Sequence, residues 1–196
     1  MKLLCLAVLA LSLFTAKSSA QSDDDVPHFE LGVVFSGIHL PDNNNFGVGG
    51  RAVFNLNSVF SLEGEGNFFL NDAKPALLSG GRAVEGLFGV KAGFRNDVVG
   101  LFAKARPGFI SFSKTIQGAT LNPSVPLAFT FQTGRLTEPA LDLGTVIEFY
   151  PAKHWAWRTD LGDTMVFYRS SSFFGVRVPG NTRNSFQFST GPEYRF

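Results

Sequence analysis

The strongest constraint on the fold is an alternation of apolar and polar residues that recurs in eight segments of the chain. In the first segment Phe29, Leu31 and Val33 share one parity, and Glu30 and Gly32 share the other. A period of two is that of a β-strand, whose successive side chains point to opposite faces. The segments cover approximately residues 29–38, 46–56, 59–70, 82–95, 98–112, 141–150, 155–162 and 185–196. At roughly 10 residues each, they have the length that a tilted strand needs to cross a bilayer.

The connections between these segments alternate strictly between short and long. The short ones are residues 57–58, 96–97 and 151–154, and the long ones are residues 39–45, 71–81, 114–140 and 163–183. Such alternation is typical of an up-and-down barrel with tight periplasmic turns and long outer loops. The sequence therefore predicts an all-β fold, an eight-stranded antiparallel up-and-down transmembrane β-barrel. Because Pro107 cannot donate a ladder hydrogen bond, we expect a bulge or the membrane exit at that residue.

The N-terminal residues 1–20 have the pattern of a secretory signal peptide, with Lys2, an apolar run over residues 3–14 and small residues before Gln21. Cys5 would leave with the signal, so the mature chain would have no disulfide. Residues 21–27 are predicted to be a disordered acidic tail, followed by the barrel at 28–196. Removing the signal leaves 15 Lys and Arg against 16 Asp and Glu, a balance that indicates no nucleic-acid partner.

Alternation alone leaves open whether the apolar parity faces lipid or fills the core of a water-soluble barrel. In the middle of the predicted strands the apolar parity carries no Lys, Arg, Asp or Glu. A Lys or Arg at the middle of a lipid-facing wall costs about 2–4 kcal/mol, so such a wall excludes them. Aromatic residues also gather near the short turns, as in an interfacial girdle: Phe54, Phe60, Phe94, Phe149, Trp155, Trp157, Tyr194 and Phe196. We therefore predict that the apolar parity faces lipid.

The polar parity would then line the lumen, which in an eight-stranded barrel is just wide enough to be filled by side chains. The predicted lumen residues are Glu30, Arg51, Glu63, Glu65, Glu85, Lys91, Arg95, Lys104, Arg106, Asp142, Glu148, Arg158, Asp160, Glu193 and Arg195. These are eight acids and seven bases, close to neutral as a set. Since buried charges need partners, a crosslinked polar plug is expected. The alternative is a narrow conductive path gated by the same pairs.

The final segment ends with Tyr194 and Phe196 on its apolar parity, so the alternation closes on a terminal aromatic residue. With the eight alternating segments and the unequal connections, this resembles the family of small eight-stranded bacterial outer-membrane β-barrel proteins. The resemblance implies location in the bacterial cell outer membrane and contact with outer-membrane lipid. It also implies that Tyr194 and Phe196 belong to an assembly signal for the barrel-assembly machinery. Family members include structural, adhesive, resistance-related and enzymatic proteins, so the resemblance specifies architecture better than activity.

Candidate chemical groups are few. His39 in the first outer loop could lie near the serines at 170–172, but no spacing motif supports a hydrolytic site. The outer-loop acids Asp72, Glu138 and Asp163 are too scattered to argue a calcium site. We therefore predict no catalytic residue, no metal and no cofactor.

The outer loops are the remaining place where a function could lie. The connection at 114–140 is rich in apolar residues, which suits either strand extensions above the membrane or a surface for an extracellular ligand. We predict a non-enzymatic integral outer-membrane protein with an envelope-structural or surface-interaction role. The alternatives are a small pore or transporter of the outer membrane and, third, a surface lipid-modifying enzyme.

Overall fold

The computed structural model describes residues 26–40, 43–121, 129–173 and 176–196. Its strands are β1 (Phe29–His39), β2 (Asn44–Asn55), β3 (Phe60–Ala73), β4 (Gly81–Arg95), β5 (Val99–Leu121), β6 (Phe129–Ala152), β7 (Trp155–Tyr168), β8 (Ser171–Phe173), β9 (Val176–Val178) and β10 (Asn181–Arg195). Within these ranges no helix has both the length and the apolar character needed to cross a membrane. The predicted signal peptide lies outside the described residues.

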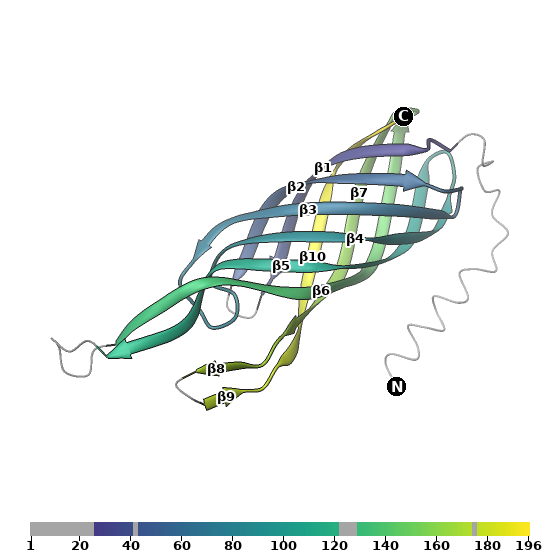
Figure 1. Cartoon of the computed structure of the whole chain (residues 1–196). Helices are drawn as coiled ribbons and strands as arrows, with labels where there is room; N and C mark the ends of the chain where they lie inside the picture. The colour runs from purple at the N-terminus through teal and green to yellow at the C-terminus, as the bar shows by residue number, and fades with distance from the viewer. Residues whose placement is uncertain (1–25, 41–42, 122–128, 174–175) are drawn as a thin grey trace.

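Eight of the strands form a closed antiparallel barrel in the order β1-β10-β7-β6-β5-β4-β3-β2 (Figure 1). The first and last strands close the ring, with Glu30 opposite Arg195 and Ile38 opposite Gln187. Each predicted segment corresponds to one barrel strand, so the predicted fold class is confirmed. Closure satisfies the backbone hydrogen bonds of both edge strands, which a hydrocarbon environment requires.

The bulge expected at Pro107 is not present. The register of β4 against β5 is the same on both sides of this residue, from Leu87 opposite Gly108 to Val90 opposite Ala105. The ladder with β4 skips Pro107, which lacks an N–H, while the ladder with β6 continues through it opposite Leu141. Bulges occur further along β5, after Phe112 and after Ile116.

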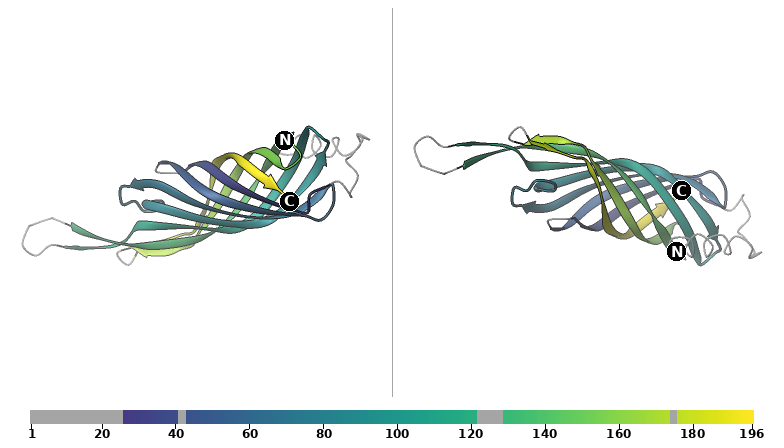
Figure 2. Two further views of the ribbon diagram at one scale, coloured as in Figure 1. Left: turned by 90° about the horizontal axis from the view of Figure 1, so that it is seen from above. Right: turned by 90° about the horizontal axis from the view of Figure 1, so that it is seen from below.

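The long connection predicted at 114–140 is mostly strand, as the strand-extension interpretation expected. β5 and β6 have 23 and 24 residues, against 11 to 15 in the other barrel strands. Pairing of β4 with β5 ends at Phe112, and pairing of β6 with β7 begins at Ala140. Residues 113–121 and 129–139 therefore form a two-stranded ribbon that projects past the barrel (Figures 1 and 2). The small β8–β9 hairpin lies in the last connection.

The two faces of the barrel wall differ sharply in exposure. On β4, Phe88 is 63% exposed on the exterior, whereas Glu85 on the lumen side is 1% exposed. Leu87, which departs from the apolar parity of its segment, points inward and is 3% exposed. An apolar exterior around a charged interior is the inverse of a water-soluble protein and matches a barrel surrounded by lipid.

The aromatic residues at the end of the barrel with the short turns form a contiguous group. Tyr194 lies 5.3 Å from Trp155 and 4.9 Å from Phe196 between ring centroids, and Phe196 lies 5.9 Å from Phe29. Trp157 donates its indole N–H to the Thr190 hydroxyl at 3.0 Å. Amphipathic rings at this height suit the boundary between hydrocarbon and headgroups.

Candidate functional site

The lumen contains most of the charged groups of the barrel. All fifteen residues predicted to line it are buried there, and the most exposed of them, Lys104, is 5% exposed. They arise from every strand of the ring because each strand places one parity inward. Such low exposure means that hardly any of these side chains can contact water. Side chains therefore fill the part of the lumen that holds the charged residues.

Arg158 joins opposite walls of the barrel. It lies on β7, four positions around the ring from β3, and its guanidinium contacts Glu63 on β3 at 2.7 Å. The same guanidinium contacts Asp160 on its own strand, also at 2.7 Å. Charge-assisted hydrogen bonds in a dehydrated interior are among the strong ones. The pair therefore braces the ring across its diameter.

Glu65 connects two further arginines to this centre. Its carboxylate accepts from Arg51 at 2.6 Å and from Arg106 at 2.7 Å. Arg106 also contacts Asp142 at 2.6 Å, and Lys104 reaches the same carboxylate at 2.8 Å. The network thus links β2, β3, β5, β6 and β7 through shared partners. A group with several ion-pair partners loses less side-chain entropy per contact than an isolated surface pair does.

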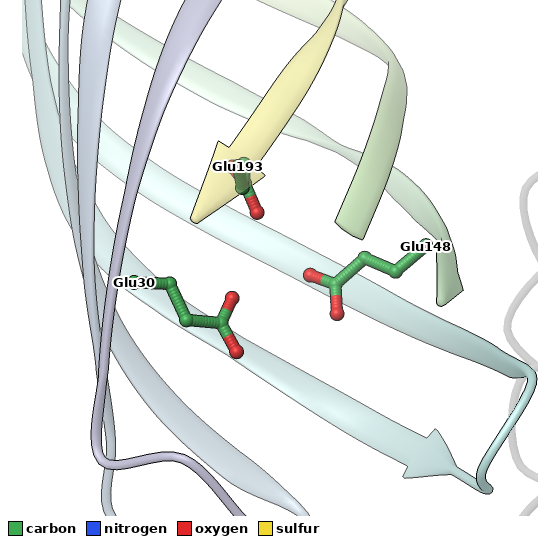
Figure 3. Close-up of side chains that lie close together, drawn as sticks. All are labelled: Glu30, Glu148 and Glu193. Atoms are coloured by element: carbon green, nitrogen blue, oxygen red, sulfur yellow. The ribbon is translucent and has the colours of Figure 1, made fainter. Parts of the chain in front are cut away.

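Three carboxylates converge in the lumen near the end of the barrel that has the short turns. Glu30, Glu148 and Glu193 come from β1, β6 and β10, and each offers an oxygen within 4.8 Å of the others (Figure 3). The sequence analysis did not foresee this convergence, because only the closed ring brings these strands together.

Each of these three carboxylates has a cationic partner. Arg195 lies 3.3 Å from Glu30, Arg51 lies 2.9 Å from Glu193, and Lys91 is paired with Glu148. A divalent ion at the centre of the three carboxylates would meet these positive side chains. The three carboxylates could supply oxygen ligands, but Arg195, Arg51 and Lys91 already neutralise their negative charge. The geometry therefore fits an ion-pair network better than a metal site.

Neutral polar side chains complete the network, and charge-based reasoning missed them. Asn67 and Gln187 donate to Glu85 at 2.9 and 2.8 Å, and Tyr150 donates to Glu148 at 2.6 Å. Their signal in the sequence was weak, because amide and hydroxyl side chains are as common on solvent-exposed faces as in a polar lumen. Among the described residues Glu85 forms no salt bridge, and the two amides occupy the place of a cation.

An apolar cluster lies in the lumen at the outer end, above the charged network. Its members are Ile38, Leu40, Phe69, Ala83, Ile110, Phe112, Val166 and Tyr168, with Leu78 and Leu136 packed against them. The sequence analysis missed this cluster, because both parities are apolar there, as in the neighbours Phe68 and Phe69. We call it the apolar cap. It covers the outer end of the charged network with side chains from β1, β3, β4, β5 and β7.

The histidine considered for catalysis is exposed and has a different partner. The Nδ1 atom of His39 lies 2.5 Å from Oδ1 of Asn44. Ser170 is exposed, and the side chains of 171 and 172 lie outside the described part. The acids considered for calcium each have separate contacts: Asp72 with Lys114, Glu138 with Arg169 and Asp163 with Asn184.

Comparisons with known proteins found similarity in structure but not in sequence. No protein-family model and no curated protein matches the chain. The N-terminal β-barrel domain of Pseudomonas aeruginosa OprF aligns at 11% identity over 90% of this chain and 100% of that one, with a TM-score of 0.46. Neisserial surface protein A aligns at 12% identity over 86% and 96%, with a TM-score of 0.47. Ail of Yersinia pestis aligns at 15% identity over 86% and 96%, with a TM-score of 0.44.

The fold assignment rests on this chain's own geometry. Its ring is closed and antiparallel, its exterior is apolar, and its interior is charged and paired. The chain is therefore a closed eight-stranded antiparallel β-barrel, and an apolar exterior around a paired, charged interior is what a barrel needs in order to stand in a lipid bilayer.

Proposed function

We propose that this protein is a non-enzymatic, non-conducting barrel that anchors a surface-contact structure in the outer membrane. The observation that carries the proposal is the filled lumen. Along the barrel axis the charged network occupies one part of it, and the apolar cap occupies the outer end. A conducting path would need water in contact with the charged groups, and these are at most 5% exposed. A surface enzyme would need a base beside a nucleophile, and His39 is bonded to an amide instead.

The projecting ribbon supports the surface-contact part of the proposal. Beyond Phe112 and Ala140 its two strands form ladder pairs with each other and with neither β4 nor β7. At the base of the ribbon the backbone N–H groups of Lys114 and Ile116 donate to the carbonyls of Gly80 and Ala76, so among the described residues the unpaired edge of β5 begins beyond Ile116. It presents apolar surface, including Phe131, which is 57% exposed. Unpaired strand edges and exposed aromatic groups are features through which proteins bind extended segments of a partner. The barrel wall then serves to hold the ribbon at a fixed height.

The folded protein is expected to give no steady conductance steps in planar lipid bilayers, because the ion pairs and the apolar cap leave no continuous aqueous path. The measurement is single-channel recording of purified protein reconstituted in lipid. The control is a detergent gel of the same preparation, in which the folded band must shift on boiling. Reproducible steps of one size from the folded fraction would contradict the proposal and favour a small pore.

We further propose that the end of β10 is read by the barrel-assembly machinery during insertion. Tyr194 and Phe196 lie on the exterior and are 37% and 60% exposed. The backbone N–H of Phe196 donates to the carbonyl of Phe29 at 2.8 Å. Phe196 therefore belongs both to an accessible aromatic group and to the contact that joins the last strand to the first.

Deletion of Phe196 is expected to slow assembly severalfold, because it removes the last aromatic ring and the closing hydrogen bond together. The measurement is pulse-chase labelling at native expression, followed by the heat-modifiable fraction in the outer membrane. Phe196→Tyr is the control that retains the ring and should assemble normally. Wild-type assembly kinetics of the deletion variant would remove Phe196 from the proposed signal.

A further inference from the structure

A groove of about 420 Å³ lies on the exterior of the barrel, over the outer ends of β3 to β6. Phe68 and Val84 form its lower part, and they continue the lipid-facing wall. Above them the groove is lined by the cations Arg82, Lys114 and Arg135 and by Asp72. Phe68 lies opposite Val84 in the ladder, so the two apolar residues are neighbours on one face.

The height of the groove corresponds to the outer edge of the membrane. On the exterior of β4 the apolar residues extend from Phe94 to Val84, ten positions along the strand. At about 3.3 Å per residue and a tilt of about 45°, this distance covers roughly 23 Å of bilayer, close to the typical apolar band of about 25 Å. Arg82 is the next exterior residue outward, and it therefore lies where hydrocarbon gives way to headgroups.

The groove retains positive charge after its internal ion pair is counted. Lys114 contacts Asp72 at 2.6 Å, and its hydrogen bond holds the pKa of Asp72 below the ordinary range. Within the described ranges, Arg82 and Arg135 form no salt bridge with any acid. Three cations, Arg82, Lys114 and Arg135, thus face the single carboxylate of Asp72, and the groove keeps a net positive charge beside a surface that is apolar on its membrane side.

We propose that this groove binds a phosphorylated lipid of the outer leaflet, with a headgroup phosphate on Arg82 and Arg135 and acyl chains along Phe68 and Val84. Guanidinium groups bind phosphate oxygens in pairs, and they do so best where water is partly excluded. Continuity with the lipid-facing wall favours a lipid over a free anion, because only a lipid would use both parts of the groove. The bound lipid would hold the base of the projecting ribbon, since Lys114 and Arg135 lie there.

Direct binding tests this proposal. The full mature barrel, folded in uncharged dodecylmaltoside micelles, is titrated with diphosphoryl lipid A, and bound lipid is counted by native mass spectrometry. We expect diphosphoryl lipid A to bind more tightly than monophosphoryl lipid A and much more tightly than phosphatidylcholine. Inorganic phosphate at millimolar concentration should compete weakly. Competition by inorganic phosphate at the same concentration as lipid A would overturn the lipid proposal in favour of a simple anion site.

The double variant Arg82→Gln with Arg135→Gln is expected to weaken lipid A binding at least tenfold, because it removes both guanidinium groups that line the groove. Lys153→Gln with Arg183→Gln is the matched control: it removes two exposed cations elsewhere and should bind as the wild type does. All four sites are on the surface, so heat-modifiable folding should be retained. Equal affinity of wild type and the Arg82/Arg135 variant, or equal loss in the control variant, would overturn the assignment of the groove.

Discussion

Replacing Arg158 with Met is expected to destabilise the folded barrel by about 3 to 5 kcal/mol, the range for breaking a buried ion pair from one side. The side chain is fully buried, and it contacts Glu63 on the opposite wall and Asp160 on its own strand. Its removal leaves two carboxylates without their nearest cation in a dehydrated lumen. The measurement is urea unfolding in lipid vesicles, followed by the fluorescence of the nearby Trp155 and Trp157.

A second variant separates the effect of losing the ion pair on stability from the effect of losing the packing of the Arg158 side chain. Glu63→Gln with Arg158→Met also removes one of the two carboxylates that lose their nearest cation, and this double variant should recover part of the stability lost in Arg158→Met. If Arg158→Met costs less than about 1 kcal/mol, or if the double variant loses the sum of both single changes, the bracing role of this pair is wrong.

Phe88→Arg is expected to destabilise the membrane-inserted barrel by about 2–4 kcal/mol, the cost of a cation at the middle of a lipid-facing wall. Phe88 lies near the centre of the exterior of β4 and is 63% exposed to what we infer is hydrocarbon. The measurement is the same urea unfolding in vesicles, together with the fraction that folds on insertion.

Val98→Arg is the matched control for depth. Val98 is also apolar and 54% exposed, but it lies in the short turn between β4 and β5, where charge meets water or headgroups. Its replacement should cost about 0–1 kcal/mol. Equal costs for the two substitutions would mean that the wall around Phe88 does not face hydrocarbon.

The sequence by itself was sufficient to predict the strands and their facing. A period of two depends only on local backbone geometry, so Glu85 and Phe88 could be assigned to opposite faces before any partner strand was known. The same parity rule identified the charged residues that the structure buries in the lumen. It could not explain Leu87, whose inward position follows from the register of its strand rather than from its own polarity.

Only the tertiary structure decided which of these residues meet. Glu63 and Arg158 are brought together because the ring closes with β3 opposite β7, and no local pattern contains that closure. The apolar cap escaped prediction because apolar residues occur on both parities near the outer ends of the strands, as at Phe68 and Phe69, and periodicity then carries no information. The groove beside Arg82 likewise depends on the lateral pairing of β3 to β6. The face to which a side chain points is set by the local geometry of its own strand. Which side chains touch across the lumen or along the wall is set by the closure of the barrel.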